Sequence, residues 1–224
     1  VLIVVVIQIR WALSARTSLY AIGRMLLQLL LIGYVLLFLF ESEHAVLVSL
    51  VLVVMITVSS WIALRPIATE RRRLYPAALM AITVAGLPVL FLTTKWVLDI
   101  TPWYAPRYLI PLAGMIFASA MNSVSIAAER YVSEFSSGLN HVEARRKAFE
   151  AALIPLINSL LAVGLVSLPG MMTGQVLAGI SPLIAVRYQI LVMCMLFGSS
   201  GIAVACYLYW SKLSHRTRDS KEVQ

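Results

Sequence analysis

The chain has 224 residues, of which 61% are hydrophobic and 12% are charged. Soluble domains have roughly 45–50% apolar and about 25% charged residues, so this composition excludes a soluble protein and indicates an integral membrane protein. The net charge of +8 does not indicate nucleic-acid binding, because the basic residues are scattered among short connections and the tail. Cys194 and Cys206 both lie in the last apolar block and form no disulfide framework.

The apolar blocks predict an all-α, polytopic membrane protein that forms a single transmembrane domain over residues 1–224. The first block, Val1–Ile9, is too short to cross a core of about 30 Å at about 1.5 Å per residue. We interpret it as a truncated first span, which brings the expected total to about seven. The six others are expected at Met25–Phe40, Ala45–Leu64, Tyr75–Thr94, Tyr108–Ala128, Ala148–Leu168 and Tyr188–Trp210.

The charged residues predict the orientation of these spans. All 28 Lys, Arg, Asp and Glu residues fall in expected connections, at span edges or in the tail, with Arg24 placed in the first connection. Basic connections alternate with connections that have few basic residues. The positive-inside rule therefore predicts the N-terminus outside, and the C-terminus with its basic tail, residues 211–224, in the cytoplasm. Within the fourth span, Gly86 and Pro88 predict a kink.

One long polar interval, Ala127–Pro155, separates two strongly apolar blocks and is cytoplasmic in this orientation. Gly138 predicts a chain break, and the helix expected after it carries an apolar stripe of Leu139, Val142, Ala148 and Phe149 among charged residues. This pattern is typical of a helix that docks onto another surface. The alternative is an ordinary connection with solvated charges.

The motifs of common enzymes are absent from the sequence. It has no phosphate-binding GxxxxGK[ST] loop, no HExxH, no GxSxG and no Cys/His spacing that would hold a structural metal. Its three histidines, His44, His141 and His215, fall in connections or the tail. We therefore expect a non-enzymatic chain that holds no cofactor. The spans also lack the ionisable relay of a proton-coupled transporter, so energy for uphill transport would come from another polypeptide.

Polar and helix-breaking residues within the spans suggest further sites. Asn122 and Asn158 lie in the middle of two spans, where they could line a substrate path or form hydrogen bonds between helices. The sequence Pro169–Gly174 ends an expected span, and broken backbone at membrane depth must be buried in protein or line a cavity. Within it, Met171 and Met172 could ligate a soft metal such as Cu(I), or could fill gaps in the packing.

These residues also carry a resemblance to a known family. The sequence VGLVSLPGMM at 163–172, with Gly174, AGI at 178–180, Pro182 and YQI at 188–190, resembles the signature of the FetB family of ABC transporter permeases. Similar segments run through most of the chain, at 23–24, 28–29, 33–34, 111–116, 120–121, 151–155 and 205–208. This family includes the membrane half of a bacterial system linked to iron export, and plant relatives linked to aluminium tolerance.

The resemblance implies a coupling helix, within a cytoplasmic segment at about residues 129–150, that docks on a separate ATP-binding subunit. Gly138, Glu143 and Ala144 occupy the matching places, and with Leu139 they are the expected coupling residues. One departure is that this chain reads GLNH at 138–141 where the bacterial pattern has a GATP-like turn.

The resemblance also implies two copies of the chain with two ATPase subunits, which would hold ATP and Mg²⁺, in a bacterial inner membrane. The expected cargo is a metal ion, iron first. The substrate path would include Asn122, Asn158 and the stretch from Pro169 through Gly170 to Met171 and Met172, the last two as metal ligands. The alternatives are a permease for a non-metal substrate such as a nucleotide sugar, or a channel or scaffold that is not driven by ATP.

Overall fold

The computed structural model describes residues 2–10, 15–41 and 44–222. Every regular element in these ranges is a helix, which confirms the all-α class. The chain divides into two compact units, residues 1–47 and residues 48–224. The second unit contains all of the predicted site residues.

The first unit consists of α1 (Leu2–Arg10) and the long helix α2 (Ala15–Glu41), which contact each other. The placement of Arg24 in a connection was wrong, because Arg24 lies inside α2 and inside a candidate membrane span, Arg16–Phe40. Arginine is a good helix former and its long stem can carry the charge toward an interface, so this residue does not end the helix.

The helix α3 (Ala45–Ala63) starts at the end of the first unit and lies mostly in the second, where a short 3-10 helix, η1 (Arg65–Ile67), follows it. It continues with α4 (Arg71–Phe91), the π-helix η2 (Leu92–Val97) and α5 (Pro106–Ser136). The last elements are α6 (His141–Ala162), α7 (Gly170–Leu177) and α8 (Pro182–Glu222). The helix α4 passes Gly86 and Pro88 without ending, and its backbone changes to the wider π form at Leu92.

Five described helices are long and apolar enough to cross a membrane: α2, α3, α4 with η2, α5 and α8. Two of the seven expected spans are not among them. The α1 helix has only 9 residues. The expected span Ala148–Leu168 stops at Ala162, so the apolar part of α6 covers about 22 Å of a core of about 30 Å.

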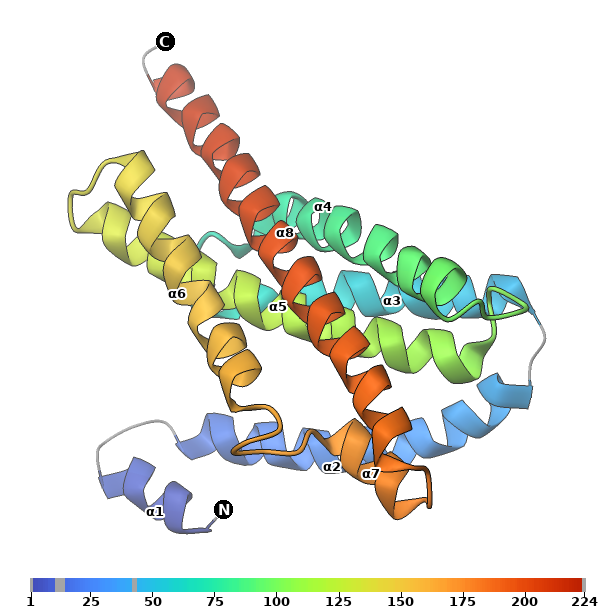
Figure 1. The fold of residues 1–224 in the computed structure, drawn as a ribbon. Helices are drawn as coiled ribbons and strands as arrows, with labels where there is room; N and C mark the ends of the chain where they lie inside the picture. Colours follow the sequence, from blue (N-terminus) through green and yellow to red (C-terminus); the bar gives the residue numbers. More distant parts are fainter. Residues whose placement is uncertain (1, 11–14, 42–43, 223–224) are drawn as a thin grey trace. The chain divides into compact units, whose positions relative to one another are not determined.

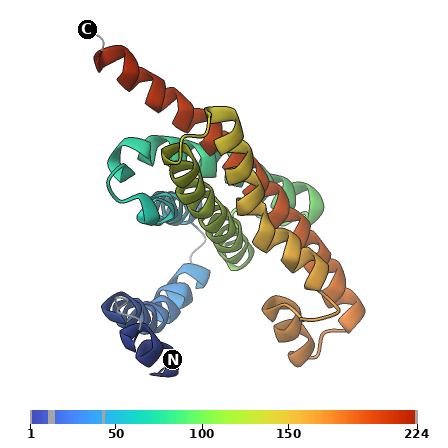
Figure 2. The ribbon, with the colours of Figure 1, turned by 90° about the vertical axis from the view of Figure 1, so that its left-hand side faces the viewer.

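The core of the second unit forms where α4, α5 and α8 pack against one another (Figure 1). Small side chains at the contacts bring the backbones close, as is usual between helices in membranes. Those buried at 0–1% exposure include Ala78, Ala81, Ala85, Ala113, Ala120, Ala127, Ser199, Ser200 and Ala203. The hydroxyl groups of Ser119 on α5 and Ser200 on α8 form a hydrogen bond of 2.8 Å. The α6 helix packs on α5 and lies alongside α8 (Figure 2).

Candidate functional site

The predicted break at Gly138 is confirmed, and its local sequence explains it. Gly138 has φ +90°, a left-handed conformation that a glycine adopts without a Cβ penalty. Its N–H donates to the carbonyl of Phe135, and the N–H of Leu139 donates to the carbonyl of Glu134. These are the two bonds of a Schellman motif, which ends α5. Asn140 then caps α6, because its Oδ1 accepts from the N–H groups of Val142 and Glu143 at 3.0 and 2.9 Å.

Side chains on both sides of this turn tie α5 to α6. The hydroxyl of Tyr131 lies 2.7 Å from Nδ1 of His141, and the ring of His141 stacks on Phe135 with centroids 4.4 Å apart. The ammonium of Lys147 lies 3.0 Å from the carboxylate of Glu134. The segment expected at about 129–150 is therefore a helical hairpin, formed by the end of α5, the turn Ser137–Asn140 and the first turns of α6. It contains no separate short helix, because α6 continues unbroken from His141.

The apolar stripe expected on this helix divides between two faces. Ala144, Ala148 and Ala152 repeat at a spacing of four and are fully buried, and they form the face of α6 that packs on α5. Ala144 is therefore packed against α5 in this structure, and its expected coupling role stays a prediction. Val142 is 62% exposed and Glu143 is also exposed, so both are available for contact. Leu139 is half-buried in the turn.

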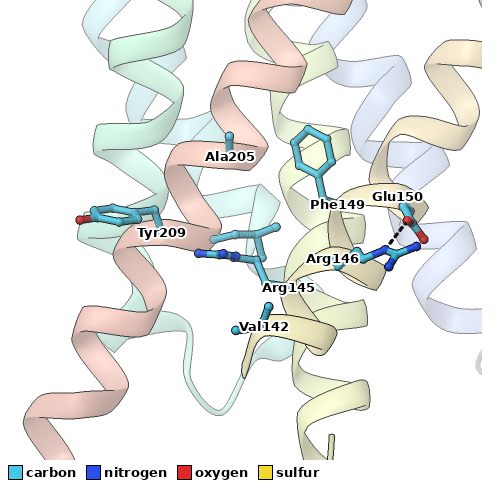
Figure 3. Close-up of a pocket in the computed structure, with 8 residues that line it drawn as sticks. Val142, Arg145, Arg146, Phe149, Glu150, Ala205 and Tyr209 are labelled. Carbon is cyan, nitrogen blue, oxygen red and sulfur yellow. Dashed lines mark hydrogen bonds and ion pairs between the residues drawn. The ribbon is translucent and has the colours of Figure 1, made fainter. Parts of the chain in front are cut away.

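A hollow of about 440 Å³ lies between the first turns of α6 and the part of α8 at residues 205–209 (Figure 3). From α6 it is lined by Val142, Arg145, Arg146, Phe149 and Glu150, and from α8 by Ala205, Leu208 and Tyr209. Arg146 pairs with Glu150 at 3.0 Å, whereas Arg145 extends between the two helices. The contribution of α8 was not predicted, because nothing in the sequence near Tyr209 indicates which helix lies opposite.

The two predicted polar sites within the helices face away from the packed core. Asn122 on α5 and Asn158 on α6 are both exposed. Neither amide has a hydrogen-bond partner among the residues that the structure describes, and the alternative role in hydrogen bonds between helices stays a prediction. Their role on a substrate path stays a prediction.

The chain break after α6 comes earlier than expected. Val163 leaves the helical conformation, Gly164 has φ +81°, and the N–H groups of Leu165, Val166 and Ser167 all donate to the carbonyl of Ala162. Pro169 is the N-cap of α7, so Gly170, Met171 and Met172 lie in a helix and not in broken backbone. The correction has a simple cause: a glycine with positive φ ends α6 before the proline is reached.

Met171 and Met172 line different hollows, each of about 310 Å³. Met171 faces one that also contains Arg107, Tyr108 and Tyr188. Met172 faces another, beside Met193. Adjacent residues on a helix point about 100° apart, as its 3.6 residues per turn require. The two thioethers therefore line separate hollows in this structure, and their role as metal ligands stays a prediction.

These features define the class of the protein. Five long apolar helices, small-residue packing between them and a charged hairpin at one end make it an integral, all-α, polytopic membrane protein. Residues 1–214 match the family described as Uncharacterised protein family (UPF0014). The chain belongs to this family.

Named relatives cover most of the chain. A UPF0014 membrane protein of Synechocystis sp., slr1647, is 37% identical over 209 residues, which cover 85% of this chain and 81% of the relative. The Probable iron export permease protein FetB of Escherichia coli is 35% identical over 217 residues, which cover 87% and 80%. Protein ALUMINUM SENSITIVE 3 of Arabidopsis thaliana is 31% identical over 231 residues, which cover 93% and 83%. No solved structure matches the chain.

Proposed function

We propose that this chain is the transmembrane permease subunit of an ABC transporter that exports a metal ion, iron first, with ATP and Mg²⁺ held by a separate ATP-binding subunit. The observation that carries the proposal is the hairpin of α5 and α6, which ends in exposed residues of α6 while its other face is fixed to the bundle. The name of the Escherichia coli relative, an iron export permease, supports the cargo.

The hairpin suits a mechanical role because it is braced on two sides. Its arms are joined by Tyr131 with His141 and by Lys147 with Glu134, and the alanine face of α6 has no room to slide independently. A partner that pushes on Val142 and Glu143 would move α5 and α6 together. The exposed surface carries Glu143 beside Arg145 and Arg146, so the docking groove of the partner is expected to be apolar, with a basic group opposite Glu143 and acidic groups opposite the arginines.

ATP would drive transport by changing the relative stability of two arrangements of the helix bundle. Binding of ATP between two partner subunits shifts the equilibrium only if it favours one arrangement over the other. Nucleotide-binding domains of ABC transporters act in pairs and each chain offers one hairpin, so the proposal includes two copies of this chain. The exposed Asn122 and Asn158 are then available to face a cargo path or the second copy.

The test is reconstitution of the full chain in liposomes with its candidate ATP-binding subunit. ATPase activity is measured while Fe(II), Fe(III), Cu(I), Zn(II) or a nucleotide sugar is titrated. Stimulation by iron is the expected result. Stimulation by the nucleotide sugar alone would keep the permease and replace its cargo. Failure to form a complex would contradict the proposal and favour a channel or scaffold.

A further inference from the structure

A second hollow lies at the break between α6 and α7, far along the helices from the hairpin. Its volume is about 310 Å³, and one wall consists of Val163, Gly164 and Leu168 from the break, with Met172 from α7. The opposite wall is a face of α8. The hollow exists because α6 stops at Ala162 and the chain turns back before α7 begins.

The α8 wall places three chemically distinct groups together. Gln189 and Met193 lie four residues apart on one face of α8, and the exposed Cys194 follows Met193. An amide, a thioether and a thiol therefore all line the hollow. Met172 adds a second thioether from the opposite wall. Cys194 is a free cysteine. Among the described residues that line the hollow, Gln189 is the one polar side chain, and none is charged.

Gln189 is the observation that points to a ligand. Gln189 is only 5% exposed, yet its buried Oε1 has no hydrogen-bond partner among the described residues. A buried carbonyl oxygen without a partner is costly, and native structures usually explain such a group by an ion, a water or a functional role. An electropositive ligand within the hollow would supply the missing interaction.

We propose that this hollow binds a soft monovalent cation of the Cu(I) type through the sulfur atoms of Met172, Met193 and Cys194, with Gln189 Oε1 beside it. Thiolate and thioether ligands select Cu(I) over hard cations. The Cys194 thiol releases its proton to the solvent as the metal–sulfur bond forms, so the bound thiolate and a monovalent ion together are neutral. Fe(II) at the same ligands would leave a net positive charge among apolar walls, which disfavours it.

This inference goes beyond the proposed function and does not depend on it, because it concerns binding by this chain alone. From the sequence, Met171 and Met172 were expected as a pair of metal ligands. The structure assigns only Met172 to this hollow and directs Met171 to a different one. It also adds Cys194 and Met193, which were not predicted as ligands.

The experiment measures Cu(I) affinity of the full chain in detergent under anaerobic conditions, by competition with a chromophoric Cu(I) chelator. Cys194→Ser and Met172→Leu are each expected to weaken binding by about tenfold or more. The chain offers matched controls in Cys206→Ser and Met171→Leu, whose parent residues do not line this hollow. Both controls are expected to keep the wild-type affinity, and Fe(II) is expected to compete poorly.

A separate variant tests whether weaker Cu(I) binding could result from misfolding of the chain. Gln189→Leu removes the unpartnered oxygen, so it is expected to raise thermal stability while it weakens Cu(I) binding by about tenfold. X-ray absorption of the bound copper is expected to contain sulfur scattering that decreases in Cys194→Ser. Equal Cu(I) affinity in wild type, Cys194→Ser and Met172→Leu would overturn the site. So would a loss of affinity that is as large in the two controls.

Discussion

Gly138→Ala is expected to reduce metal transport per ATP hydrolysed by about tenfold in the reconstituted transporter, with the chain still inserted in the membrane. Gly138 has φ +90°, and nothing lies within 4 Å of the position that a Cβ would take. The penalty therefore comes from the backbone alone, about 1–2 kcal/mol. The turn relieves this strain by changing conformation, which shifts the start of α6 relative to α5. Transport and ATP hydrolysis are measured on the same vesicles.

The control for this change is Gly198→Ala. Gly198 lies inside α8 in an ordinary helical conformation, and it also has nothing within 4 Å of a Cβ. The substitution is expected to leave coupling unchanged and to favour the helix slightly. The comparison of the two variants therefore distinguishes the effect of strain in the turn at Gly138 from the effect of an added methyl group.

Reversal of the charge at Glu143 tests the same surface without introducing backbone strain. Glu143 is exposed, and its side chain forms no ion pair within the described chain, so Glu143→Arg is expected to leave folding unchanged and to weaken coupling by repulsion at the docked partner. Glu129→Arg, an exposed position on the α5 arm, is the matched control. If Gly138→Ala and Glu143→Arg both retain full coupled transport, the hairpin does not have the role proposed for it.

Gly86→Ala is expected to destabilise the bundle strongly, because the added methyl group would clash where α4 meets α5. A Cβ at this position would lie 2.6 Å from Cε1 and 3.0 Å from Cδ1 of Phe117, and 3.3 Å from Cγ2 of Ile116. Phe117 is 2% exposed and Ile116 is fully buried, so neither side chain has free space to move into. We expect the free energy of unfolding to fall by about 1–3 kcal/mol, measured by thermal or denaturant unfolding in detergent.

A second substitution identifies the cause of this loss. Phe117→Leu removes the ring atoms that the new methyl group meets, so the double variant Gly86→Ala/Phe117→Leu is expected to be more stable than the sum of the two single changes predicts. Simple additivity would contradict the close approach of α4 and α5 at Gly86. Gly198→Ala again serves as the control, because it adds the same group where there is room.

The turn of the hairpin was predictable because its signals are local. Gly138 and Asn140 specify a helix end and a helix start through backbone conformation and capping, which depend on neighbouring residues alone. The same is true of the long apolar helices. The alanine repeat at 144, 148 and 152 was also visible in the sequence as small residues on one face, and it would have identified the packed side of α6.

Other features depend on which helices meet, and the sequence does not contain that information locally. Tyr209 joins the hollow at the hairpin only because α8 crosses α6 there. Met171 and Met172 are adjacent in sequence, which suggested a shared ligand, but the helix around them separates their directions. The apolar residues after Ala162 resemble the continuation of a span, whereas the positive φ of Gly164 ends it. Arg24 was misplaced because one charge was taken to mark a connection.

The central claim is that a separate ATPase drives this chain through its hairpin. The most direct measurement is iron uptake into sealed proteoliposomes that carry the full chain, with the ATP-binding subunit, Mg²⁺ and ATP added outside. We predict iron accumulation in the lumen only when the subunit and hydrolysable ATP are both present, and its loss in Gly138→Ala. Iron accumulation without the subunit, or none with the complete system, would contradict this mechanism.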